Sequence, residues 1–255
     1  MTSATIAQIP VFIINLDSSP ERFVHAEQQL QALGIQPQRF RGVYGKDLSP
    51  AEVDACYDKS ANLQYFRRSL SPGEIGCYLS HRGVWQLMVE QNIEVAIVLE
   101  DDIDVDARFA DALAQISRLS GWDHIKLSDD RDTPAFARKA LDNGFELVNF
   151  KRVPNCATGY AMSLSGAKKL LQRDKFFRPV DLDLQFGAEL DLQLFSLLPY
   201  TIWPSTKFDS VINQISGGSR KGDTTALRNL KYRLQVAWQR WRYISGNLSK
   251  INNLI

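Results

Sequence analysis

The sequence predicts an α/β fold with a mostly parallel sheet flanked by helices. Apolar, β-branched segments that fit buried strands alternate along the chain with segments of helical periodicity, an order that is typical of a parallel sheet. The strand segments are apolar on both faces, as strands covered by helices on both sides are. With 255 residues, of which 44% are hydrophobic, the chain is long enough to bury a substantial core.

The expected elements follow one another in this alternating order. The expected strands are 11–16 (VFIINL), a short one within 36–45, 94–102, 124–130, 145–150 and 159–164, the last two as a pair. The expected helices are 20–33, one within 49–69, one beginning at 71, 110–119, 165–171 and about 184–198. Gly34 suits the end of the first helix, and Ser71 and Glu74 have the spacing of a capping box around Pro72.

Composition narrows the class of protein. Acids and bases nearly balance at a formal net charge of +1, so no global charge points to nucleic acid. The three cysteines, Cys56, Cys77 and Cys156, are far apart, which argues against a disulfide framework or a zinc site and fits a reducing compartment. The first apolar run has no basic residue before it, and no run of about 18 apolar residues occurs, so we expect a cytoplasmic protein without a spanning helix.

The segment 97–109, IVLEDDIDVDARF, places five carboxylates within seven positions directly after an apolar strand. Alternation along an extended chain puts Glu100, Asp102 and Asp104 on one side and Asp101 on the other. In open α/β sheets, ligands bind beyond the carboxyl ends of strands, where these acids lie. Hard cations such as Mn²⁺ and Mg²⁺ bind carboxylates and take further ligands from water and phosphates. The cluster therefore predicts a site for such a cation.

Three other interpretations of these acids compete. They could simply cap a helix that begins near Ala107, because Asp104 and Asp106 would favour the positive end of its dipole. An EF-hand loop would match at Asp102, Asp104 and Asp106, but it requires Gly and Glu where the chain has Ala107 and Leu113. A phosphatase with an aspartyl nucleophile also needs acids after a strand, although little else in the chain supports it.

Four segments together resemble glycosyltransferase family 25, the lipopolysaccharide and lipooligosaccharide glycosyltransferases related to collagen galactosyltransferases. They occur in the family's order and span about residues 11–184: VFIINLDSSPER, LSPGEIGCYLSHRGVW, the strand with LEDD, and ATGYAMSLSGAKKLL with PVDLDL. The resemblance implies a GT-A type fold, with a Rossmann-like half that binds the nucleotide. It also implies inverting transfer of a hexose, galactose or glucose, from a UDP-sugar to a glycan acceptor, with Mn²⁺ or Mg²⁺ bridging the diphosphate.

The resemblance also implies roles for residues in the acidic segment. Asp102 and Asp104 are the expected metal ligands, with Asp101 as a third candidate. Glu100 is expected to contact the ribose or to support the ligands. A bound cation would neutralise the charge that develops on the UDP leaving group, which explains why acids would gather where an acidic ligand binds.

Further implied roles lie near the first strand. Asn15 and Leu16 match the family's nucleotide-contacting I-N-L segment, and Arg22 is expected near the diphosphate, with an exposed helix base as the alternative. For Glu74 we expect capping and for His81 a structural role, because a lone histidine is more often satisfied within the core than a ligand.

Two departures from the family pattern bear on the donor and the metal. The usual A-V-D-G appears as Gly42, Val43, Tyr44 and Gly45, so a tyrosine replaces an acid expected near the donor sugar. No histidine follows His124, so a third metal ligand late in the chain would have to be a residue such as Gln214 or Asn213.

Inverting transfer requires a base that takes the proton of the acceptor hydroxyl, and a carboxylate is the usual choice. Asp181 lies where the family's V-D falls, and Asp183 points the same way if the segment is extended. These two are the expected catalytic residues, with Asp191 as the third choice. The alternative is that such acids only cap the helix that begins near Leu184.

Residues 223–255 form a basic tail that is separate from the catalytic domain expected over 1–222. Residues 223–255 hold one acid, Asp223, and six bases, namely Arg228, Lys231, Arg233, Arg240, Arg242 and Lys250. Apolar residues recur there in steps of three and four, which predicts an amphipathic helix. It could pack on its own domain, pair with another subunit, or lie in an anionic membrane surface. We expect peripheral contact with the inner face of the cytoplasmic membrane, which would suit a lipid-linked glycan acceptor.

Overall fold

The computed structural model describes residues 9–129, 131, 133–150, 152–208 and 224–247. The strands are β1 (Val11–Asn15), β2 (Gln38–Arg41), β3 (Val95–Glu100), β4 (Ile103–Val105), β5 (His124–Lys126), β6 (Ala135–Ala140), β7 (Glu146–Phe150), β8 (Gly159–Ser163), β9 (Leu194–Leu198) and β10 (Ile202–Pro204). The helices are α1 (Pro20–Ala32), α2 (Pro50–Cys56), α3 (Lys59–Tyr65), α4 (Pro72–Glu90), α5 (Phe109–Ile116), α6 (Leu164–Leu170), α7 (Val180–Asp183) and α9 (Ala226–Asn247), with 3-10 turns η1 (Asp142–Gly144) and η2 (Leu184–Glu189).

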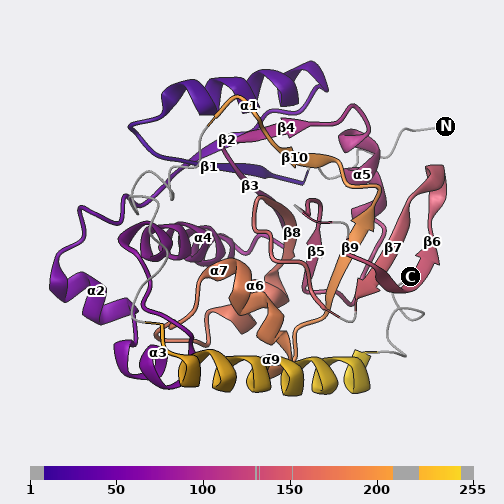
Figure 1. Cartoon of the computed structure of the whole chain (residues 1–255). Helices are drawn as coiled ribbons and strands as arrows, with labels where there is room; N and C mark the ends of the chain where they lie inside the picture. The colour runs from indigo at the N-terminus through magenta and orange to yellow at the C-terminus, as the bar shows by residue number, and fades with distance from the viewer. Residues whose placement is uncertain (1–8, 130, 132, 151, 209–223, 248–255) are drawn as a thin grey trace.

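An eight-stranded sheet forms the centre of the molecule, in the order β2-β1-β3-β8-β5-β9-β7-β6 (Figure 1). β2, β1, β3, β5, β9 and β6 run in one direction, and only β8 and β7 run in the other. The prediction of a mostly parallel sheet flanked by helices is therefore confirmed, and the arrangement is consistent with a GT-A-like fold. The parallel neighbours β1 and β3 end side by side, at Asn15 and Glu100, which brings the acidic segment next to the end of the first strand.

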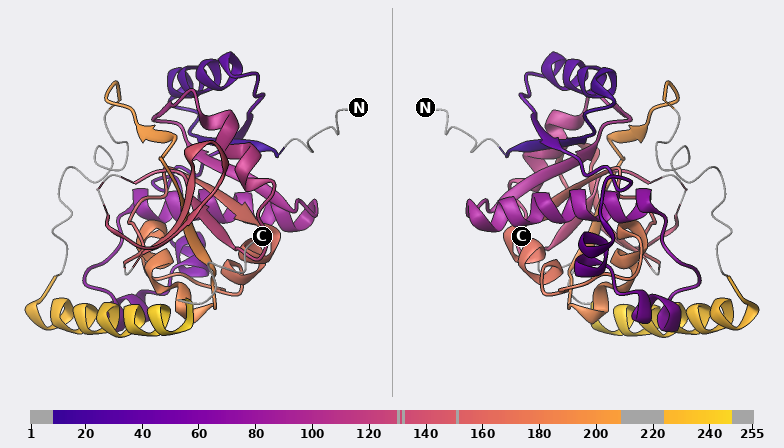
Figure 2. Two further views of the ribbon diagram at one scale, coloured as in Figure 1. Left: turned by 90° about the vertical axis from the view of Figure 1, so that its right-hand side faces the viewer. Right: turned by 90° about the vertical axis from the view of Figure 1, so that its left-hand side faces the viewer.

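Two apolar layers hold the sheet between helices (Figures 1 and 2). On one face Phe12 of β1 packs in a cluster with Tyr78 and Trp85 of α4, to which α6 and α7 also contribute. On the other face Ile13 lies in a cluster with Leu30 of α1, which α5 completes. Both faces are therefore buried, which explains why the strand segments are apolar without alternation. Burying each of these large side chains contributes about 2 kcal/mol.

The boundaries of α1 and α4 follow from the residues that predicted them. Gly34, at φ +75°, ends α1 in the left-handed conformation that glycine adopts without strain. At the start of α4 the Ser71 hydroxyl accepts from the backbone of Glu74 at 3.3 Å, and the Glu74 carboxylate accepts from the backbone of Ser71 at 2.9 Å. The capping box is therefore confirmed, and the helix predicted within 49–69 forms as α2 and α3.

Two predictions about secondary structure are wrong. The segment 184–198 is not one helix, because η2 ends at Glu189 and β9 occupies Leu194–Leu198. The strands at 145–150 and 159–164 both form, but they do not pair. β7 lies between β9 and β6, whereas β8 is inserted between β3 and β5. A short apolar run such as LFSLL does not by itself distinguish a buried strand from a buried helix.

The final helix α9 confirms the prediction of a helical tail over 226–247 and packs along η2 and α3 at one edge of the molecule (Figure 1). The predicted boundary at residue 222 and the end of the tail at 248–255 lie outside the described residues. Within the described ranges, no helix combines the length and the apolar character that crossing a bilayer requires.

Candidate active site

The acidic segment divides at the end of β3 instead of continuing as one extended strand. β3 ends at Glu100, the chain bends at Asp101 and Asp102, and β4 then pairs with β10 in a separate two-stranded sheet. The expectation that Glu100, Asp102 and Asp104 share one side rested on a continuous strand. The bend separates them and gives each acid its own surroundings.

Asp101 is buried and held by two of the predicted nucleotide-binding residues. The Asn15 amide donates to one carboxylate oxygen at 2.7 Å, and the Arg22 guanidinium donates to the other at 2.9 Å. Burial raises the pKa of Asp101, while Asn15 and Arg22 oppose the rise. Both oxygens are engaged within the protein, so this residue ties β1 and α1 to the end of β3. Arg22 is itself only 5% exposed, which excludes the alternative of an exposed helix base.

The Asp102 side chain is more exposed to solvent than that of Asp101, and its surroundings disfavour the ionised carboxylate. The second nitrogen of Arg22 lies 3.2 Å from one of its oxygens, and the side chain is 26% exposed. Burial raises the pKa of Asp102 to about 6, and the charge of Glu100 adds to the rise while Arg22 opposes it. Two carboxylates that repel one another at the end of a strand fit a site for a divalent cation.

Asp104 has a different partner from this pair. It pairs with His25 of α1, with 2.9 Å between the ring nitrogen and the carboxylate, and its side chain is 43% exposed. As a residue of β4 it belongs to the two-stranded sheet. Asp106 accepts from the backbone of Arg108 at 2.8 Å just before α5, so it belongs to the turn that leads into this helix, which has no side-chain cap hydrogen bond.

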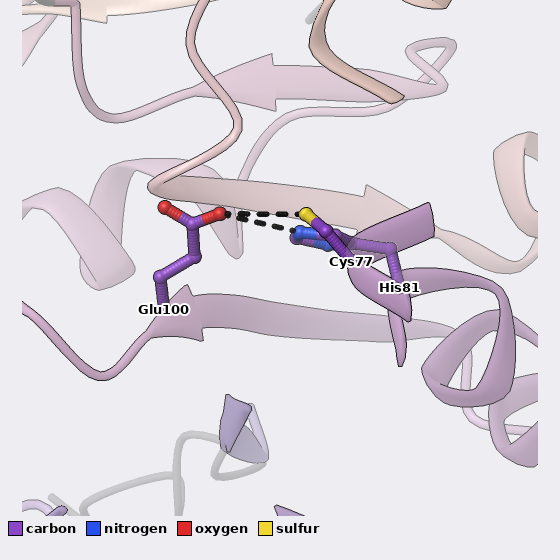
Figure 3. A group of neighbouring side chains, drawn as sticks. All are labelled: Cys77, His81 and Glu100. Atoms are coloured by element: carbon purple, nitrogen blue, oxygen red, sulfur yellow. Dashed lines mark hydrogen bonds and ion pairs between the residues drawn. The ribbon is translucent and has the colours of Figure 1, made fainter. Parts of the chain in front are cut away.

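Glu100 points into a cavity of about 170 Å³ that Asp181 also lines. The Thr158 hydroxyl donates to Glu100 at 3.1 Å, and His81 and Cys77 of α4 approach it at 3.7 and 3.9 Å (Figure 3). Burial alone would raise the pKa of Glu100, but His81 and Thr158 outweigh it, so the pKa is lowered. Glu100 therefore stays ionised in the wall of the cavity.

Cys77, His81 and Glu100 bring their ligand atoms within 4.8 Å of one another, so they form a second possible cation site (Figure 3). Burial and the charge of Glu100 raise the pKa of Cys77 well above its usual value, which disfavours the thiolate that binds metals. His81 has its Nδ1 at 2.8 Å from the Tyr160 hydroxyl, whereas its Nε2 is buried without a hydrogen-bond partner. These contacts hold the Glu100 carboxylate in one orientation beside the cavity.

The three predicted catalytic acids lie in different places. Asp181 lines the cavity with Glu100, and burial raises its pKa to about 6, with Glu74 and Glu100 adding to the rise against Lys126. Asp183 is 5% exposed and accepts from Arg178 at 2.8 Å and from Tyr78 at 2.8 Å, so it is bound within the core.

Asp191 precedes β9, at the edge of the sheet opposite the end of β3, and it is exposed. Its backbone carbonyl accepts from Lys169 at 2.9 Å. The structure therefore brings Asp181 together with Glu100 and leaves Asp183 and Asp191 away from the cavity.

The loop after β2 carries the departure from the family pattern. The backbone of Gly42 donates to the Asn15 carbonyl at 2.8 Å, and Leu16 packs beside Gly42. This contact keeps Leu16 and Tyr44 near the end of β1, and Tyr44 is partly buried there. Gln214, the weakest of the predicted metal ligands, lies outside the described residues.

Comparison with known proteins now adds to this geometry. The model of a family described as glycosyltransferase family 25 (LPS biosynthesis protein) matches residues 8–184. The chain belongs to glycosyltransferase family 25. The matched region contains Asn15, the acidic segment and Asp181, and it ends before Asp191 and α9.

Relatives of this family 25 chain occur in animals. A glycosyltransferase 25 family member of Aedes aegypti is 32% identical over 187 residues, which are 68% of this chain and 29% of that protein. Procollagen galactosyltransferase 1-B of Xenopus laevis is 30% identical over 220 residues, covering 76% of this chain and 36% of that protein. Procollagen galactosyltransferase 2 of Mus musculus is 28% identical over 223 residues, covering 76% and 35%. The chain thus spans about a third of the length of these relatives.

Sequence reasoning gave no site role to Cys77 and Thr158 and expected only a structural role for His81, although all three surround Glu100 in this family 25 site. Cys77 and His81 are four positions apart on α4, a spacing that puts both on one helix face and could have signalled a shared target. Thr158 gives no comparable signal, because it precedes β8, whose place beside β3 appears only in the fold.

Proposed function

We propose that the chain is an inverting, metal-dependent glycosyltransferase that moves a hexose from a UDP-sugar to a hydroxyl group of a glycan acceptor. One observation carries the proposal: Glu100 and Asp181 line the same cavity, and Asp102 lies close enough to Glu100 for the charge of Glu100 to raise its pKa. The site therefore offers two carboxylates for a cation and a third carboxylate for proton transfer. Membership of family 25 supports the same reading.

In this proposal Glu100 and Asp102 hold Mn²⁺ or Mg²⁺, and Asp101 acts through Arg22 and Asn15 to fix the end of β3. The donor set fits a hard cation, because its oxygens are carboxylates whose mutual repulsion a cation would relieve. When bound, the cation would neutralise charge on the diphosphate leaving group. Arg22 donates to both Asp101 and Asp102 and thereby orients the Asp102 carboxylate.

Asp181 is the proposed base. It accepts the proton of the acceptor hydroxyl while that oxygen attacks the anomeric carbon, and the bond to UDP breaks with its electron pair leaving on the diphosphate. A pKa of about 6 suits this task, since Asp181 is ionised near neutrality and is more basic than an ordinary aspartate. The transferred sugar is proposed to be galactose, which the names of the vertebrate relatives support, with glucose as the alternative.

The acceptor is proposed to be a lipopolysaccharide or lipooligosaccharide, or another lipid-linked surface glycan, reached at the inner face of the cytoplasmic membrane. The description of the matching family as LPS biosynthesis proteins supports this class. The basic helix α9 supports the location, because its exposed apolar side chains fit an anionic lipid surface.

Calorimetric titration with UDP, in the presence and absence of Mn²⁺, tests the proposal. We expect Mn²⁺ to tighten UDP binding, and Asp102→Asn to weaken the metal-dependent part by about tenfold or more. Asp104→Asn is the matched control, because this exposed acid pairs with His25 and should leave the binding unchanged.

The other functions give different results in the same assays. A Mg²⁺-dependent phosphohydrolase would cleave simple phosphate esters and show no metal-enhanced UDP binding. A non-catalytic binding module would bind UDP but neither transfer nor slowly hydrolyse any UDP-sugar. If Mn²⁺ has no effect on UDP binding, the proposed function is wrong.

A further inference from the structure

A second pocket, of about 510 Å³, is lined by arginines that come from separate parts of the chain. Its cationic residues are Arg67, Arg131, Arg152, Arg233 and Arg240. The remaining lining residues include Asn155, Leu182, Gln185 and Tyr232, and none of the lining residues is acidic. A pocket of this composition has the chemistry of an anion site.

Four of these five cations lack the acidic partners that arginines often have. Among the described residues, no carboxylate forms an ion pair with Arg67, Arg152, Arg233 or Arg240. Burial lowers the pKa of Arg240, and the charge of Arg152 lowers it further. The Nε of Arg240 is also buried without a hydrogen-bond partner. Several positive charges therefore lie around one pocket, and at least the Nε donor of Arg240 is unused there. A bound anion would stabilise this arrangement.

The pocket adjoins the catalytic cavity at the end where the proposed base lies. Asn155 lines both spaces, and Asp181 of the cavity is followed directly by Leu182 of the pocket. The charge of Asp181 also raises the pKa of Tyr232, which lines the pocket, although burial is the larger cause. Asp102, one of the two acids proposed to hold the donor's cation, lies in contrast beside Arg22, after the end of β3.

We infer that the arginine pocket binds a phosphate group of the acceptor, so that the acceptor is a phosphorylated glycan whose reactive hydroxyl lies within a sugar or two of that phosphate. This inference rests on the proposed function, because it takes Asp181 to mark the acceptor end of the site. Guanidinium groups bind phosphate through paired N–H donors, and several of them around one pocket suit a dianion better than a single carboxylate. A neutral glycan would make no use of this cationic lining.

The test compares binding of glucose 6-phosphate and of glucose to the full chain with Mn²⁺ and UDP present. We expect the phosphorylated sugar to bind and to raise the melting temperature, and glucose to do neither. In the double variant Arg152→Gln/Arg240→Gln the affinity for the phosphorylated sugar should fall about tenfold or more. Affinity for UDP with Mn²⁺ should stay within about twofold, since the pocket is separate from the donor site.

Arg242→Gln is the matched control. Arg242 lies on the same helix α9 but stacks on Trp238, 4.8 Å from the ring centre, and does not line the pocket. Its variant should keep full affinity for the phosphorylated sugar. The double variant should melt at the same temperature as the unmodified chain or higher, because it removes repulsion, and this excludes unfolding as the cause of lost binding.

Several results would overturn the inference. These are equal affinity for glucose and glucose 6-phosphate, unchanged phosphate binding in the double variant, or an equal loss in Arg242→Gln. If the double variant instead loses UDP binding, the pocket serves the donor and the inference is wrong, although the proposed function stands. Absence of metal-enhanced UDP binding in the unmodified chain would reject the proposed function itself.

Discussion

Asp181 and Asp183 are two residues apart and have opposite environments. Asp183 is surrounded by cationic and hydroxyl donors, with Arg178 and Arg173 within 3.1 Å of its oxygens. Asp181 faces the cavity, where burial and the acids Glu74 and Glu100 raise its pKa to about 6. An acid that is stabilised in the core serves the fold, whereas an acid that the fold destabilises is available for chemistry.

This contrast predicts opposite effects on stability. The folded-state pKa of Asp181 lies above the ordinary value of 3.8, so the folded state binds the proton more tightly and ionisation of Asp181 costs stability above about pH 6. Asp181→Asn should therefore stabilise the protein by about 1–3 kcal/mol at pH 7. The gain should shrink as the pH falls from 6 towards 4, and denaturant unfolding at these pH values measures it.

The same variant should lose transfer activity by a factor of about 10²–10⁴ while UDP binding persists. Asp183→Asn is the comparison, and it should destabilise the protein by about 3 kcal/mol, because it leaves Arg178 and Arg173 without their buried partner. If Asp181→Asn is the less stable of the two variants at pH 7, the assignment of these roles is wrong.

Asp102 predicts the pH dependence of metal binding. Its pKa of about 6 means that the carboxylate is ionised at neutral pH and becomes protonated as the pH falls through 6. Because a cation needs the ionised form, Mn²⁺-dependent UDP affinity should fall about tenfold per pH unit below that value. Titrations between pH 5 and pH 8 measure this, and a metal effect of constant size across the range would contradict it.

At the scale of elements, α4 connects the sheet to the loop after β2. Gly76 of α4 packs directly on the backbone of this loop, where an added Cβ would lie 2.5 Å from the Val43 carbonyl and 2.7 Å from the Gly45 nitrogen. Four residues later the Ser80 hydroxyl accepts from the backbone of Val43 at 2.8 Å. The helix that supplies Cys77 and His81 to the site therefore also fixes the loop that carries Tyr44.

Gly76→Ala should force these two backbones apart. We expect a loss of stability of about 2 kcal/mol or more, since neither contact is with a flexible side chain. We also expect weaker UDP binding, because the loop lies at the end of β1. Gln86→Ala, at an exposed position of the same helix, should change neither property. Thermal unfolding and UDP titration measure both, and a Gly76→Ala protein with unchanged melting temperature would contradict this account.

At the scale of the whole molecule, α9 is attached by its polar and aromatic side and leaves an apolar stripe exposed. Arg228 donates to the Phe66 carbonyl and Tyr232 packs edge-on against the Phe66 ring, whereas Gln239 is buried on Glu189. The exposed stripe consists of Leu227, Leu230, Leu234, Trp238 and Trp241, each 53–67% exposed. At about 100° per residue these five side chains fall within an arc of about 80°.

This arrangement favours the membrane among the three interpretations of the tail. Lys231 and Arg242 border the stripe on one side and Arg233 borders it on the other, as on helices that lie in an anionic lipid surface. The packing on η2 and α3 uses the other side of the helix, so intramolecular packing does not account for the apolar residues. Figure 2 shows α9 along one edge of the molecule, with its length open to the outside.

Co-sedimentation with vesicles tests this interpretation. The unmodified chain should sediment with vesicles that contain anionic lipid and much less with neutral ones. Leu234→Glu/Trp238→Glu should reduce this binding about tenfold or more, because it removes buried apolar area and adds repulsion. Val24→Glu is the control, at a 45% exposed apolar residue of α1 at the opposite end of the molecule (Figure 1). Equal sedimentation of all three proteins, or of none, would contradict membrane docking.

The local sequence pattern predicted most of the helices and strands but not all of the strand pairings. The caps at Ser71 and Gly34 and the apolar runs of β1 and β3 depend on residues close in sequence, so they could be predicted. β9 could not, because LFSLL is buried on both faces and has no periodicity that separates strand from helix. The place of β8 between β3 and β5 depends on pairing between residues that are 34 to 68 positions apart in the sequence, which no local signal contains.

For the site, the acidic segment by itself predicted a cation site at the carboxyl end of a strand, with Asp102 as one of its ligands. It did not indicate which acids share a space, because that depends on the bend after Glu100 and on what surrounds each carboxylate. Arg22 and Asn15 engage Asp101, Arg22 also reaches Asp102, His25 pairs with Asp104, and Glu100 lines the cavity with Asp181. Hydrogen-bonding and cationic partners from distant parts of the chain decided this.

The sequence by itself determined the family, the alternation of strands and helices, and the presence of a basic amphipathic tail, since each is written in residues that are near one another. Only the tertiary structure decided that Asp181 shares a cavity with Glu100, that five arginines from four parts of the chain line one pocket, and that the tail turns its apolar side outward. The physical reason is that burial and the charges of neighbours determine what an ionisable or apolar side chain does, and chain topology sets both.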